Sequence, residues 1–132
     1  MKILLLVIVC CIHFGSMAQN WSYLESNEIY GISVSESSFE DKSADISHAR
    51  LIFKYENFSD SELELTFNRE VAYGADFIQQ EQDFKVIIPA KSSVEYTTEN
   101  ANDKTYYLFV KDKNGHIKST LRDFRITNIK HN

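Results

Sequence analysis

Hydrophobic and polar residues alternate in two runs near the middle of the chain, which are separated by a short polar segment. Each run places three apolar side chains on one face, Leu51, Phe53 and Tyr55 in the first and Leu63, Leu65 and Phe67 in the second. Apolar residues at every second position share one side of a β-strand. The segment between the runs holds turn-forming residues such as Asn57 and Asp60, so the pattern predicts an antiparallel hairpin with Phe53 and Phe67 in the core.

Similar patterns predict strands along the rest of the chain, at residues 29–35, 84–88, 94–98, 105–111 and 121–129. Residues 20–27 are expected to form either a first edge strand or a strap across the sandwich. Residues 74–83 are expected to form a loop with a brief edge strand.

Asn114-Gly115 suits a hairpin turn, because both residues tolerate positive φ. Near Arg69, a bulge is expected to turn the guanidinium outward. Seven or eight short strands without a helical period predict a single all-β sandwich or barrel.

The N-terminus has the pattern of a secretory signal peptide. A basic start at Lys2 precedes an apolar run over residues 3–12, and Ser16-Met17-Ala18 offers small residues for cleavage. We therefore expect residues 1–18 to be removed after Ala18, leaving one domain over residues 19–132. The apolar run is too short for a permanent membrane span. Both cysteines of the chain lie in the signal, so the mature protein is expected to be free of cysteine.

Composition and motif searches exclude several classes of function. The chain has 19 acidic and 14 basic residues and a net charge of −5, which argues against a nucleic-acid partner. Three histidines remain after cleavage (His48, His116 and His131), and their spacing does not suit a zinc site. No nucleophile motif, catalytic base or phosphate loop is recognisable, so no catalytic residue, metal or cofactor is expected. An irregular calcium site in the acidic loops stays open, with candidate ligands Glu36, Glu40, Asp41, Asp45, Glu99 and Asp103.

A short segment resembles the entry to the sixth strand of immunoglobulin-like domains. Asp103, Thr105 and Tyr107 match the Asp, small residue and Tyr of that pattern, and Phe109 takes the place of its cysteine. The whole chain resembles small secreted bacterial immunoglobulin-like proteins of unassigned activity. The resemblance implies a two-sheet sandwich of seven to eight antiparallel strands, with Tyr107 as the corner tyrosine and Phe109 as a core residue.

The strand at residues 105–111 is apolar on both faces, which is unusual for a two-layer sandwich. If Tyr107 and Phe109 face the core, Tyr106, Leu108 and Val110 must lie on the other face. We expect either the Trp21 segment, the loop at residues 77–78 or a partner to cover that face. Trp21, Tyr106, Leu108 and Val110 are therefore the candidate binding residues.

The sequence thus favours a secreted, periplasmic or extracellular interaction module without catalytic activity. The expected partner is a protein or glycan at the cell envelope, with no nucleic acid and no membrane span. One alternative is a carbohydrate-binding module that stacks sugars on surface aromatics. The other is a hydrolase with a pair of carboxylates.

Overall fold

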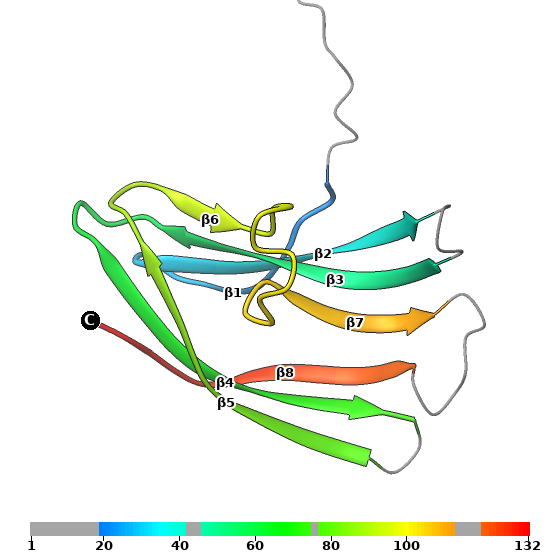
Figure 1. The fold of residues 1–132 in the computed structure, drawn as a ribbon. Coiled ribbons are helices and arrows are strands. Elements are labelled where there is room, and N and C mark those ends of the chain that lie inside the picture. Colours follow the sequence, from blue (N-terminus) through cyan, green and yellow to red (C-terminus); the bar gives the residue numbers. More distant parts are fainter. Residues whose placement is uncertain (1–18, 42–45, 75–76, 113–119) are drawn as a thin grey trace, which may run out of the picture.

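The computed structural model describes residues 19–41, 46–74, 77–112 and 120–132 (Figure 1). These residues form eight strands and no helix. The strands are β1 Ser22–Ser26, β2 Tyr30–Asp41, β3 Ile46–Asn57, β4 Leu63–Tyr73, β5 Phe77–Ile88, β6 Ser93–Glu95, β7 Tyr107–Asp112 and β8 Leu121–His131.

The strands form two antiparallel sheets that pack face to face. Sheet A has the order β1-β2-β3-β6. β7 pairs with the same edge of β3 as β6 does, but nearer the N-terminal end of β3. Sheet B has the order β5-β4-β8. Figure 1 shows the two sheets as separate layers, with sheet B strongly bent. The all-β sandwich predicted from the sequence is confirmed, and residues 20–27 provide an edge strand, β1.

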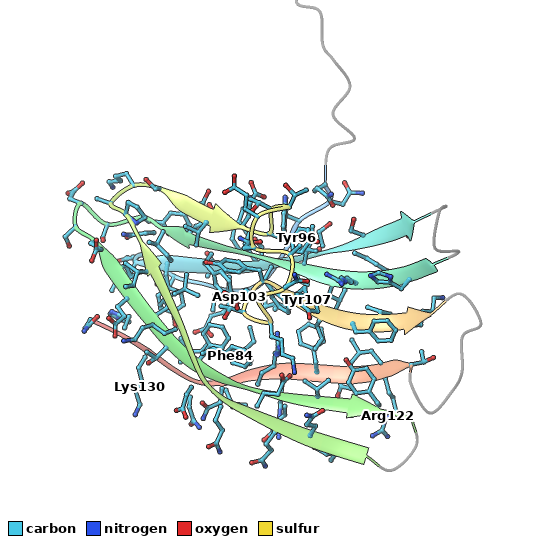
Figure 2. All side chains as sticks on the ribbon, viewed as in Figure 1. Phe84, Tyr96, Asp103, Tyr107, Arg122 and Lys130 are labelled. Atoms are coloured by element: carbon cyan, nitrogen blue, oxygen red, sulfur yellow. The ribbon has the colours of Figure 1, made fainter. Side chains whose placement is uncertain are left out.

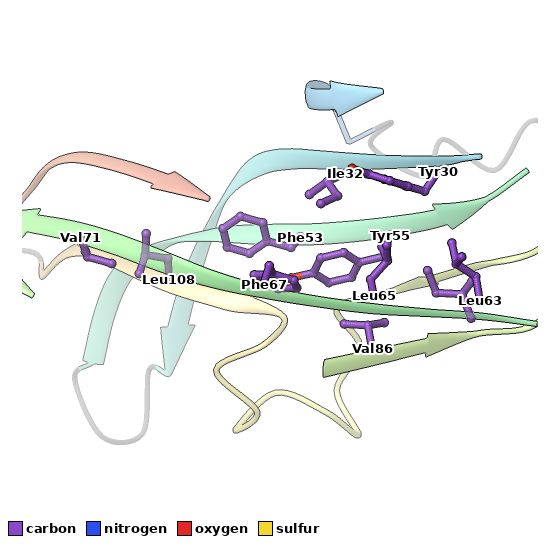
Figure 3. Packing of buried hydrophobic residues seen from close by; sticks show 11 residues of the cluster. Tyr30, Ile32, Phe53, Tyr55, Leu63, Leu65, Phe67, Val71, Val86 and Leu108 are labelled. Carbon is purple, nitrogen blue, oxygen red and sulfur yellow. The ribbon is translucent and has the colours of Figure 1, made fainter. Parts of the chain in front are cut away.

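A single core of apolar side chains fills the space between the sheets (Figure 3). The rings of Tyr55 from β3 and Phe67 from β4 stack with their centroids 5.6 Å apart, and Phe67 stacks on Phe84 at 5.3 Å. Phe53 has no exposed surface and meets the edge of the Phe124 ring. The alternation that predicted Phe53 and Phe67 as core residues is thus confirmed.

The predicted pairing of the two central runs is wrong. β3 and β4 lie in different sheets, so the segment between them crosses the sandwich as an arch. Asn57 organises this arch: it is buried, and its amide donates to the carbonyls of Ser61 at 2.8 Å and Ile88 at 3.0 Å. Polar side chains that hydrogen-bond the backbone occur both in hairpin turns and in such arches. The composition of the segment therefore does not show which of the two it forms. The Asn114-Gly115 turn lies outside the described residues, but its flanking strands, β7 and β8, also belong to different sheets.

The predictions for Arg69 and for residues 74–83 are also corrected. A bulge does lie next to Arg69, but the side chain points into the core and is only 1% exposed. Its guanidinium binds the carboxylate of Glu81 through Nε at 3.1 Å and Nη2 at 3.3 Å, and it lies 4.5 Å from the ring centre of Phe84. β5 begins at Phe77 instead of forming a loop up to Asp83. Its first half lacks apolar alternation: residues 78–80 are exposed, and Glu81 is polar because it pairs with Arg69.

Candidate interaction site

The structure does not bring the four predicted binding residues onto one surface. Leu108 is 4% exposed and belongs to the core, and the Tyr106 ring packs edge-on against Tyr55 at 5.9 Å. The predicted assignment of faces in β7 is therefore wrong, since the supposed outer face is the core face. Val110 is half-buried, and Trp21 lies on the opposite, outer face of sheet A, beside Lys54.

Tyr107 and Phe109 do not have the positions that the immunoglobulin resemblance implied. Both are half-buried on the outer face of sheet A. Arg50 Cζ lies 4.3 Å from the ring centre of Tyr107, and the ring centres of His48 and Phe109 are 6.0 Å apart. The hydroxyl that bonds backbone at this corner belongs to Tyr55, which donates to the carbonyl of Thr105. Burial raises the pKa of Tyr55, so this hydroxyl stays a proton donor.

The N-terminal aromatics contact sheet A and do not form an open row. Lys54 Nζ lies 4.9 Å from the ring centre of Trp21. The Tyr23 ring lies on Gly31, where an added Cβ would come within 2.8 Å of it, and its hydroxyl donates to Glu56 at 2.8 Å. These contacts hold Trp21 and β1 against β2 and β3. They do not favour stacking of a sugar on Trp21.

The outer edge of β7 is capped by side chains from sheet B. The outer carbonyls of β7 face β4, where Arg69 Nη1 donates to Tyr107 O at 3.2 Å and the Tyr73 hydroxyl donates to Phe109 O at 2.7 Å. Burial raises the pKa of Tyr73, which keeps its hydroxyl protonated. Such capping removes acceptors that an unpaired edge strand otherwise offers to another chain.

The other lateral side is open. Within the described residues β8 pairs only with β4, so its second edge has no partner strand. Sheet A extends past the C-terminal part of this edge, because the end of β8 lies over β2 and β1 pairs with the far side of β2. The position of β8 over β2 follows from the ring contact between His131 and Tyr30 at 5.7 Å. Sheet B is therefore one strand narrower than sheet A on this side.

A groove of about 180 Å³ lies beneath the open edge, between β8 and the first two strands. Its lining consists mainly of apolar side chains, with two charged ones: Leu24, Glu25, Ile32, Phe124, Arg125, Ile126 and Ile129. Leu24 is 42% exposed, although it contributes to the floor of the groove. In this groove, apolar side chains lie beside the unpaired backbone edge of β8.

The backbone of β8 presents hydrogen-bonding groups at the open edge. The N–H of Phe124 donates to the carboxylate of its neighbour Asp123 at 2.9 Å and so points away from β4. Strand alternation directs the N–H of Ile126 to the same side. Figure 2 shows Arg122 and Lys130 at the two ends of β8, both pointing away from sheet A. These long charged side chains therefore leave the groove uncovered.

The two charged side chains of the groove differ in their partners. The guanidinium of Arg125 turns to the outer face of sheet B, where its Nη2 binds Glu70 at 2.6 Å. Glu25 accepts a hydrogen bond from the Tyr30 hydroxyl at 3.0 Å. Burial, and to a lesser degree this hydrogen bond, raises the pKa of Tyr30. Glu25 is thus the acidic group that faces into the groove.

Comparison with family models, with curated proteins and with solved structures finds no match to this chain. No group of three His, Cys, Asp or Glu side chains in the described ranges is placed to hold a metal ion. Of the acidic-loop residues, Asp103 accepts a hydrogen bond from the Thr105 N–H, while residues 40–45 lie outside the described side chains. The described part of the chain has no helix that could cross a bilayer.

The sequence pattern missed the groove. Its apolar residues come from strands that lie far apart in the chain, and each of them resembles an ordinary core residue. The signal that existed was Leu24, an apolar residue in a polar setting before the first well-patterned strand.

Proposed function

We propose that this protein is an exported, non-catalytic, immunoglobulin-like interaction module that binds an extended polypeptide segment as an added strand beside β8. The strand order supports the immunoglobulin-like assignment. The neighbours β2-β3-β7 correspond to strands A-B-E of that fold, and β5-β4-β8 correspond to C′-C-F. Pairing of β6 with β3 departs from it. In that order, strand G lies beside F, where β8 has its open edge.

The observation that carries the proposal is the unpaired edge of β8 above an apolar groove. Strand addition needs free N–H and C=O groups for affinity and pockets beneath alternate side chains for specificity. The unpaired edge of β8 supplies the first, where the Phe124 N–H would exchange its contact with the Asp123 carboxylate for the added strand. The groove between β8 and β1 supplies the second. The β7 side lacks this combination, because Arg69 and Tyr73 occupy its carbonyls.

The width of sheet A favours a single extended segment over a second folded copy. Symmetric pairing of two β8 edges would place the partner's β8 above β1 and the partner's sheet A in the space that β1 occupies. A lone strand meets no such obstacle. It would complete sheet B and cover Leu24, Ile32 and Ile129.

We expect Leu24→Asp to weaken binding of an extended peptide by about tenfold or more, since loss of a buried leucine contact costs about 1.5–3 kcal/mol. The probe is the dodecapeptide that binds best after selection from a phage-displayed random library. Ile78→Asp is the matched control: Ile78 is also an exposed apolar residue, at 65%, but it lies outside this groove. Titration calorimetry gives the affinities, and amide exchange should show new protection at Phe124 and Ile126.

Three results would contradict strand addition. One is a library that enriches no sequence with alternating apolar residues. Another is an equal loss of affinity in the Leu24→Asp and Ile78→Asp variants. The third is a bound peptide that leaves the β8 amides unprotected while it protects amides elsewhere.

The export proposal has its own test. Expressed with its full N-terminus in a bacterial host, the protein should reach the periplasm or medium with the intact mass of residues 19–132. Removal of Lys2 with the signal changes the net charge from −5 to −6. A retained signal, or a lipid mass on Cys10 or Cys11, would show that the cleavage site or the export route is wrong.

A further inference from the structure

We infer that Glu25 selects a basic residue, lysine or arginine, at one inward-facing position of the bound segment. This inference rests on the proposed strand addition and names the chemistry of its partner. It follows from the way β1 presents two consecutive side chains to the groove and from the charge that the groove leaves uncompensated.

A bulge in β1 places Glu25 in the groove. The pairing of β1 with β2 shifts between Tyr23, which lies opposite Ser33, and Glu25, which lies opposite Ile32. Leu24 is the extra residue. In a regular strand, Leu24 and Glu25 would point to opposite faces, but both line the groove here. Re-aiming a side chain in this way is a common use of bulges.

The carboxylate of Glu25 has no cationic partner among the described residues. Its Oε1 accepts from the Tyr30 hydroxyl, which is neutral. Arg125 is the one cationic side chain in the lining, and it is bound to Glu70 on the outer face through both Nε, at 2.7 Å, and Nη2. A negative charge therefore faces an apolar groove, where an added strand would exclude water and strengthen its attraction for a cation.

The geometry of an added strand fixes the pattern that the groove should prefer. Inward side chains recur at every second residue of the segment. One inward position would lie over Glu25 and take the basic residue. The inward positions next to it would lie over Leu24 and Ile32, or towards Ile129, and take apolar residues. The preferred motif is thus a lysine or arginine with an apolar residue two positions away.

A charge-swap experiment tests this preference. The selected dodecapeptide and a variant with glutamate in place of its inward basic residue are titrated against the wild-type protein, Glu25→Gln and Glu25→Lys. We expect the wild type to bind the basic peptide about tenfold more tightly than the glutamate variant. Glu25→Gln should lose most of this preference, and Glu25→Lys should reverse it. Glu62→Lys is the control, because it changes net charge equally at an exposed residue outside the groove.

The outcomes separate this inference from the proposed function. If Glu25→Lys and Glu62→Lys lower the preference for the basic peptide over the glutamate variant equally, only the net charge of the protein matters. The role of Glu25 is then refuted. Selected peptides that alternate apolar residues without a basic one, yet protect the Phe124 and Ile126 amides, would also refute it while strand addition stands. If no peptide protects those amides, both ideas fail together.

Discussion

Replacing Phe53 by alanine is expected to lower the free energy of unfolding by about 3–5 kcal/mol. Phe53 has no exposed surface and contacts both layers, stacking beside Tyr55 in sheet A and meeting Phe124 of sheet B. The cavity left by the ring therefore lies where the two sheets meet. Because a domain of this size has about 5–15 kcal/mol of stability in total, the variant should be marginally folded. Urea denaturation followed by Trp21 fluorescence measures the loss.

Lys54→Ala provides the matched control for this substitution. Lys54 is the next residue in β3, lies on the outer face of sheet A and contacts the Trp21 ring. Loss of that cation–π contact should cost about 0.5–1 kcal/mol. Equal shifts of the two urea midpoints would contradict the described register of β3.

Replacing Glu81 by leucine is expected to destabilise the protein by about 3 kcal/mol, because it leaves the charge of Arg69 buried without its carboxylate. Glu81 is the only acid that pairs with Arg69 within the described ranges, and the two form a bidentate contact. The double variant Arg69→Met/Glu81→Leu should recover most of the loss, since it removes both charges from the core. Thermal and urea unfolding measure both variants.

This pair of variants distinguishes an ionic role from a packing role. If Glu81→Leu alone is as stable as the wild type, the carboxylate does not compensate the guanidinium, and the carbonyl of Tyr107 is a sufficient partner. If the double variant is less stable than Glu81→Leu, the stacking of Arg69 on Phe84 outweighs the charge.

Local alternation predicted where the strands lie, but it could not predict which strands pair. Burial of every second residue follows from the strand itself, so Phe53 and Phe67 could be placed in the core from sequence. Pairing depends on whether a polar connection folds back or crosses over. Asn57 bonds the Ser61 and Ile88 carbonyls in this arch, and the second of these is distant in the chain. Nothing local to the connection contains that information.

The faces of β7 could not be assigned because both are apolar. Arg50 and His48 shield the outer face of β7, so apolar residues can occur on that face as well. The alternation therefore does not show whether Leu108 or Phe109 faces the core. The same limit applies to the groove. The bulge that aims Glu25 beside Leu24 is set by pairing with β2, and a strictly alternating reading places the two side chains on opposite faces.

The arches also determine the order in which the domain can assemble. The connections β3–β4, β5–β6 and β7–β8 each pass from one sheet to the other. Before β8 has been synthesised, sheet B consists of the β4–β5 hairpin alone, and an isolated two-stranded hairpin is at best marginally stable in water. Sheet B therefore closes only when β8, the third of its strands, is available.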